Sequence, residues 1–194
     1  MLKKKLGIEA VERDWQLLLD YYKIPTTLNI TEGCERVGMG VFRYCEMLKK
    51  VIIPESVESI GEEAFGSCEK LREIVIPESV KKIYTGTFWG CYSLKKVKIP
   101  KSIRSIESSV FQYCSDLEEI EIPESIVEIG EGAFRHCEKL RKIVIPESVE
   151  KIEDEAFRGC KEATIILKKP ESEFKFIGYC AFLGVRDVKE EIRS

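Results

Sequence analysis

Cysteine, histidine and paired carboxylate side chains are the residues here whose types could support catalysis, redox chemistry or metal binding. The chain has eight cysteines and one histidine, His136, which directly precedes Cys137. Adjacent residues on a helical turn point in different directions, so a Cys–His nucleophile pair is not expected there. The carboxylate pairs Glu62–Glu63 and Glu118–Glu119 lie at repeat positions that tolerate other residues, and no nucleotide-binding or HExxH zinc motif occurs. The sequence therefore predicts no enzyme, no catalytic residue and no cofactor.

The spacing of the cysteines points to architecture instead. Six of them recur at a constant interval of 23 residues, at Cys45, Cys68, Cys91, Cys114, Cys137 and Cys160. Prolines such as Pro54 and Pro77, and phenylalanines such as Phe42 and Phe65, keep the same interval. A fixed period shared by many positions is typical of a solenoid of stacked coils.

A solenoid constrains what these cysteines can do. Neighbouring coils lie about 4.8 Å apart, which is close to the Cα separation that a disulfide tolerates. Six identical inward-pointing thiols nevertheless behave most simply as small buried hydrophobes. Zinc needs four ligands in a tetrahedron, whereas a column places its sulfur atoms along a line. We expect free buried thiols and no metal site, and Cys34 and Cys180, outside the column, match no metal motif.

Each coil has a regular internal pattern. Residues 72–76 have strand composition, with alternate residues facing the core, and Pro77 ends the strand because it cannot donate to a ladder. The spacing of the preceding core residues predicts a short helical turn on the outer side; these are Ala64, Phe65, Cys68 and Leu71.

The pattern divides the chain into three parts. Residues 1–25 are predicted to form an N-terminal capping helix, whose apolar residues recur every three or four positions and which Pro25 ends. Residues 26–185 form about seven coils, the first and last of them irregular. Residues 186–194 are predicted to be a charged C-terminal tail, as a short helix or a frayed segment.

The repeat unit closely resembles the BspA-like leucine-rich repeat family over residues 28–185. The resemblance is clearest at Cys68, Leu71, Ile74, Ile76, Pro77, Ser79, Val80 and Ile83. It implies an α/β fold: a right-handed solenoid with a parallel sheet on the concave face and short helical turns on the convex side. It also implies a microbial protein, because members are mostly microbial, many of them exported and implicated in adhesion. The family has no common catalytic residues.

Composition gives little sign of nucleic acid or membrane partners. With 31 basic and 34 acidic side chains, the formal net charge is −3, which favours neither nucleic acid nor an anionic membrane. No segment approaches the roughly 20 apolar residues that span a bilayer. The N-terminus, MLKKKLGIEAVERDW, lacks the apolar stretch of a signal peptide. As written, the chain is expected in the cytoplasm, and it would be exported only if a leader had been removed.

Binding is expected at the positions that vary between coils. One outward column alternates in sign at every step, which predicts a ladder of salt bridges: Lys50, Glu73, Lys96, Glu119 and Lys142. A second outward column exposes aliphatic side chains at both ends, with Leu167 as its continuation: Ile52, Val75, Lys98, Glu121 and Val144. Exposed aliphatic residues on an inner sheet indicate a partner surface, or are incidental strand formers.

A third candidate is an aromatic group on the outer side of one coil, formed by Tyr84, Trp89 and Tyr92. Aromatic residues are enriched at interfaces, although these also fit as local gap fillers beside Phe88.

Three functions remain open from sequence alone. The favoured one is a non-enzymatic scaffold that binds a protein partner through the concave sheet. The second, from the family resemblance, is a surface adhesin for host glycoprotein or extracellular matrix. The third is a redox- or metal-responsive function of the cysteine column.

Overall fold

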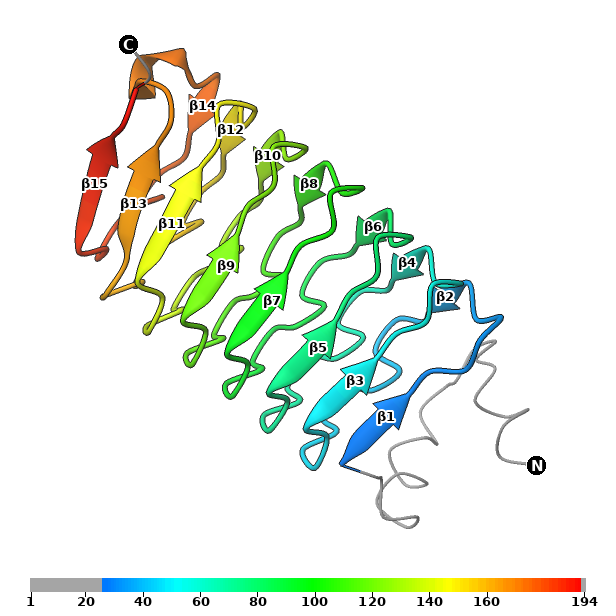
Figure 1. Cartoon of the computed structure of the whole chain (residues 1–194). Helices are drawn as coiled ribbons and strands as arrows, with labels where there is room; N and C mark the ends of the chain where they lie inside the picture. The colour runs from blue at the N-terminus through cyan, green and yellow to red at the C-terminus, as the bar shows by residue number, and fades with distance from the viewer. Residues whose placement is uncertain (1–25, 193–194) are drawn as a thin grey trace.

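The computed structural model describes residues 26–192, which form a single array of stacked coils (Figure 1). Each coil contributes one longer strand to one side of the array and one short strand to the other. β1 and β15 lie at opposite ends (Figure 1). The predicted solenoid with a parallel sheet is confirmed.

The longer strands build one continuous parallel sheet in which every strand pairs with those of the neighbouring coils. In spatial order the strands are β1 (Thr27–Asn29), β3 (Lys50–Ile52), β5 (Glu73–Val75), β7 (Lys96–Lys98), β9 (Glu119–Glu121), β11 (Lys142–Ile145), β13 (Thr164–Leu167) and β15 (Asp187–Glu190). Equivalent residues lie side by side, as Lys50 does with Glu73 and Val51 with Ile74.

The short strands on the other side form two separate parallel sheets. The first contains β2 (Arg36–Val37), β4 (Ser59–Ile60) and β6 (Lys82–Ile83), and the second contains β8 (Ser105–Ile106), β10 (Glu128–Ile129), β12 (Lys151–Ile152) and β14 (Phe176–Ile177). The interruption between β6 and β8 is visible as a wider gap in Figure 1. The long sheet continues across it through the pairing of Glu73 with Lys96.

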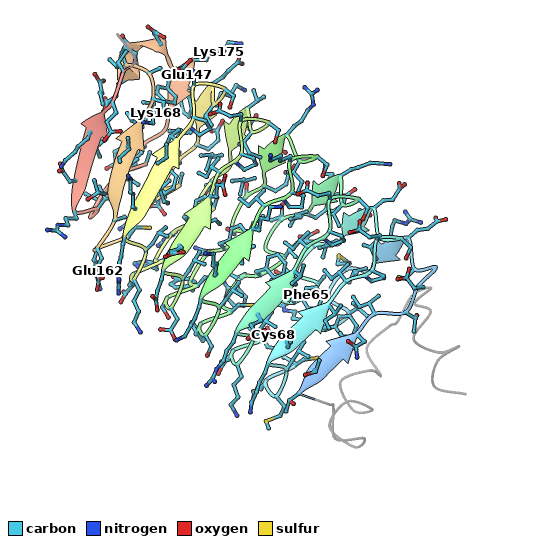
Figure 2. The ribbon with its side chains drawn as sticks, in the orientation of Figure 1. Phe65, Cys68, Glu147, Glu162, Lys168 and Lys175 are labelled. Carbon is cyan, nitrogen blue, oxygen red and sulfur yellow. The ribbon has the colours of Figure 1, made fainter. Side chains whose placement is uncertain are left out.

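Columns of identical side chains fill the interior between these layers. The phenylalanine rings stack from Phe42 to Phe182, with centroids 5.2–6.0 Å apart. Beside them runs the cysteine column, in which each thiol from Cys68 to Cys160 donates to the phenylalanine carbonyl of the preceding coil; the Cys91 Sγ lies 3.2 Å from the Phe65 carbonyl oxygen. Figure 2 shows Phe65 and Cys68 inside the coils. The predicted inward orientation of the thiols is confirmed, since Cys45 to Cys160 are all buried.

The predicted helical turns on the outer side are wrong. These segments are hydrogen-bonded turns, and the only helix among the described residues is the 3₁₀ helix η1 (Glu171–Glu173). Glu63 and Ser67 have φ values of 49° and 54°. A left-handed residue twice in five positions cannot belong to a right-handed α-helix. The turns are instead fixed by the next coil, as when the Phe65 amide donates to the Thr87 carbonyl at 2.9 Å.

We expect Ser109→Gly to stabilise the protein by about 0.5–1 kcal/mol. Ser109 has φ 56°, and glycine occupies the same position of the coil at Gly86 and Gly132. Removing its Cβ relieves about 1–2 kcal/mol of strain in the left-handed conformation. The greater conformational freedom of glycine in the unfolded chain cancels about 0.5–1 kcal/mol of that gain in stability. Urea denaturation followed by circular dichroism measures the change. The reverse substitution, Gly132→Ser, should lower the free energy of unfolding, and a lower midpoint for Ser109→Gly would contradict the assignment of strain.

Of the two ends predicted for the array, only the C-terminal one lies within the described residues. The capping helix predicted for residues 1–25 lies outside the described residues. The segment predicted as a helical or frayed tail instead forms β15, which pairs with β13 along its full length. Val188 is half-buried against the core. This inward aliphatic residue allows the segment to complete the long sheet.

Candidate functional site

The outward side of the long sheet, called here the sheet face, carries most of the predicted binding residues. Side chains alternate along each strand, so that in β5 Ile74 is buried while Glu73 and Val75 are exposed. The same pattern holds in β7 and β9. The parallel register places the exposed side chains of successive coils in two straight rows.

The first row forms ion pairs between neighbouring coils. The Lys50 Nζ lies 2.8 Å from the Glu73 Oε2, and this hydrogen bond lowers the pKa of the Glu73 carboxyl. An equivalent pair joins Lys96 and Glu119 at 2.8 Å, where the carboxylate raises the pKa of the Lys96 ammonium group. The predicted ladder therefore forms as separate pairs, and within the described residues Lys142 has no direct ion pair.

The second row exposes aliphatic side chains at β3 and β5. Ile52 is 44% exposed and Val75 is 64% exposed, and they lie side by side in the sheet. In β7 and β9 the row continues with the exposed residues Lys98 and Glu121, and Val144 in β11 is half-buried.

The predicted continuation of this row at Leu167 is wrong. Val144 pairs with Ile166, whereas Leu167 pairs with Ile145 and lies in the core. The coil is one residue shorter between Ala163 and Ile165 than between Leu140 and Ile143, and a shift of one residue moves a strand side chain to the opposite face. Ile166 is itself buried, so the exposed aliphatic row ends before β13.

A groove runs over the middle of the sheet face. A hollow of about 760 Å³ crosses β9 and β11, and a smaller one of about 300 Å³ adjoins it over β7 and β9. Glu119, Glu121 and Lys142 line both hollows. The walls carry both signs of charge, because Glu124 and Lys101 also line the larger hollow and Lys96 and Lys98 also line the smaller one.

The predicted aromatic group lies away from the sheet face, on the turns between β6 and β7. Tyr84 follows β6, and the Lys82 Nζ is 4.6 Å from the centroid of its ring. Trp89 is half-buried, and Tyr92 is exposed. A binding role for these three residues stays a prediction.

The cysteine and histidine side chains point apart and do not form a nucleophilic pair. The Cys137 Sγ faces the core and donates to the Phe111 carbonyl at 3.2 Å, and burial raises the pKa of its thiol. The His136 ring instead stacks on Tyr113 with centroids 5.1 Å apart. Across residues 26–192, histidine, cysteine and acidic side chains form no group of three or more suited to a metal ion.

Sequence reasoning missed two features of the surface. On the turn side, Glu155 forms ion pairs with both Arg135 and Arg158; the recurrence of arginine at a constant interval would have indicated this cluster. Beside the sheet face, the basic residues Lys49, Arg72 and Lys95 can be read from the sequence, but their lack of ion pairs among residues 26–192 depends on side-chain positions that a sequence does not contain.

The repeat geometry agrees with a known family. The BspA type Leucine rich repeat region matches residues 35–164 in six copies. The chain belongs to the BspA type leucine-rich repeat family. This confirms the resemblance seen in the sequence, and the family's solenoid is the fold found here.

Solved structures of leucine-rich repeat proteins are similar to this BspA type chain. One from T. pallidum is 32% identical, with a TM-score of 0.70, and the match covers 76% of this chain and 72% of the other. One from Bacteroides ovatus is 29% identical, with a TM-score of 0.61, covering 82% and 49% respectively. The pneumococcal vaccine antigen PcpA, at 18% identity and a TM-score of 0.63, shares the fold over 87% of this chain and 42% of its own.

The curated proteins contain no significant match to this BspA type chain. Within the described residues, no helix has both the length and the apolar character needed to cross a membrane.

Proposed function

We propose that this protein is a non-enzymatic scaffold that binds a protein partner through the sheet face. The observation that carries the proposal is the exposed pair Ile52 and Val75, held side by side on a rigid parallel sheet. Apolar side chains gathered on a surface favour a partner, because burying them removes apolar area from water. The family is one of repeat proteins, whose stacked coils offer extended binding surfaces.

The ion pairs beside the aliphatic pair support the same role. Lys50 and Glu73 neutralise each other next to Ile52 and Val75, which lowers the cost of covering this part of the sheet with a partner. The surface is fixed before binding, because each strand is held by the coils on both sides, so little conformational entropy is lost on association.

Quantitative pull-down from a lysate of the source organism tests the proposal. We expect the triple variant Ile52→Glu, Val75→Glu, Val144→Glu to recover at least about tenfold less of a protein that binds specifically to wild type. The reason is that the glutamate charges would be buried in the interface and would oppose association. The matched control, Met39→Glu, Met47→Glu, Leu183→Glu, changes three other exposed apolar residues and should recover the same protein as wild type. Equal recovery by both folded variants would contradict binding at the sheet face.

A second proposal is adhesion at a cell surface, which rests on the exported members of the family. It requires export of the chain, whereas the scaffold role is compatible with the cytoplasm. Fractionation of the source cells with an antibody to this protein separates the two, since an adhesin is expected on the cell surface or in the medium. Wells coated with extracellular matrix proteins then measure adhesion directly.

A further inference from the structure

A row of basic side chains borders the sheet face at the start of the long strands. Lys49, Arg72 and Lys95 each directly precede a long strand, and all three are exposed. The Arg72 amide donates to the Lys49 carbonyl at 2.9 Å, which fixes these two positions in neighbouring coils. We call these three residues the basic rim; Glu118 interrupts it in the next coil.

The basic rim has no ion pairs, unlike many other basic residues of the protein. Among residues 26–192 thirteen ion pairs form, and none of them includes Lys49, Arg72 or Lys95. By contrast, the neighbouring residues Lys50 and Lys96 are both paired. Three like charges spaced about 4.8 Å apart repel one another, and an acidic partner would relieve that repulsion.

The exposed aliphatic pair, Ile52 and Val75, belongs to the same two coils as Lys49 and Arg72. Lys49 and Ile52 are three residues apart along the chain, as are Arg72 and Val75, a separation of about 10 Å on an extended strand. Between the rim and the aliphatic pair lie the mutually neutralised Lys50 and Glu73. Over the coils of β3 and β5 the surface is thus basic on one side, neutral in the middle and apolar on the other, and in β7 the exposed Lys98 takes the place of the aliphatic residue.

We propose that this surface binds an acidic amphipathic helix that lies along the axis of the solenoid, which specifies the partner under the proposed function. An α-helix is about 10–12 Å wide with its side chains, which matches the distance from the rim to the aliphatic pair. Helical residues three or four apart are about 5–6 Å from each other, close to the spacing of the coils. Acidic residues on one edge would meet the rim, and aliphatic residues on the other edge would cover Ile52 and Val75.

The next coil limits the length of the contact. Glu118, Glu119 and Glu121 follow the rim and the aliphatic row in β9 and its approach. Three coils span about 10 Å, or two helical turns, after which a continuing acidic helix would meet carboxylates. The same carboxylates, together with the apolar pair, disfavour a sulfated polysaccharide or nucleic acid as the partner.

Selection from a phage-displayed library of helix-forming peptides, randomised on one face, tests this inference with the intact protein. We expect enriched peptides to combine Asp or Glu with Leu, Ile or Phe. Fluorescence anisotropy of the selected peptides should show at least about tenfold weaker binding to the variant Lys49→Glu, Arg72→Glu, Lys95→Glu than to wild type. The control Arg36→Glu, Arg104→Glu, Lys151→Glu, with the same change in net charge on the short-strand side, should bind as wild type does.

The other outcomes overturn the inference in distinguishable ways. Peptides that lose binding to the Ile52→Glu, Val75→Glu, Val144→Glu variant but not to the rim variant would keep the sheet face as a binding surface and reject an acidic partner. Peptides insensitive to both variants, or no enrichment, would reject the helix and leave the pull-down to decide the scaffold role. Heparin that binds through the rim, without any contribution from Ile52 and Val75, would assign the surface to a polyanion instead.

Discussion

Phe111→Ala is expected to lower the free energy of unfolding by about 3–5 kcal/mol, the usual cost of removing a fully buried aromatic side chain. Phe111 lies in the middle of the stacked column, with ring centroids 5.6 Å from Phe88 and 5.5 Å from Phe134. Its removal leaves a cavity that the neighbouring coils cannot close, because backbone hydrogen bonds fix their spacing. Urea denaturation followed by circular dichroism measures the loss.

The matched control is Phe182→Ala, at the last coil. Phe182 is only partly buried, and it stacks on one ring, that of Phe157, at 6.0 Å. We expect a clearly smaller loss than for Phe111→Ala. If the two substitutions cost the same, the column would not be the continuous core described above.

Alkaline pH is expected to destabilise the protein steeply through its buried thiols. Burial raises the pKa of the Cys91 thiol to about 12 and that of Cys114 and Cys137 well above the ordinary value. In the unfolded chain a thiol has a pKa of about 8.5. Above that pH the unfolded state loses protons that the folded state keeps, so stability falls as pH rises toward the folded pKa.

The magnitude follows from the number of thiols. Each contributes about 1.4 kcal/mol for each pH unit between its unfolded and folded pKa, so the Cys91 thiol alone removes about 2 kcal/mol by about pH 10, and Cys114 and Cys137 add to this loss. Urea denaturation at a series of pH values measures the slope. Cys91→Ala should reduce the slope, because it removes one of the buried thiols whose pKa is raised. A free energy of unfolding that is equal at pH 7.5 and pH 10 would contradict this account.

The regular part of the fold was predictable because the same residue types recur at the same positions of successive coils. Inward residues such as Cys68 and Ile74 recur at one interval, so the register of neighbouring coils follows from the sequence. The pairing of Lys50 with Glu73 follows in turn, because a parallel stack places equivalent residues side by side.

The prediction of helical turns was wrong because the backbone conformation of these segments is not the one that the spacing of their apolar residues indicates. Ala64, Phe65 and Cys68 have helical spacing, but Glu63 and Ser67 adopt left-handed conformations that neither residue type predicts. Those conformations are imposed by hydrogen bonds to the next coil.

The face assigned to Leu167 failed for a different reason. One residue is missing from the approach to β13, and strand alternation turns that deletion into a change of side. That Lys49, Arg72 and Lys95 form no ion pair within residues 26–192 could not be predicted either, because it depends on the positions of neighbouring carboxylate side chains.

The alternating charges on the long strands bear on how the chain avoids misassembly. Successive coils are so alike that one could be skipped during folding, bringing its two neighbours together. Such an error would place Lys50 beside Lys96, or Glu73 beside Glu119, and replace each attraction with a repulsion. The alternation in sign therefore disfavours a register error in which one coil is skipped.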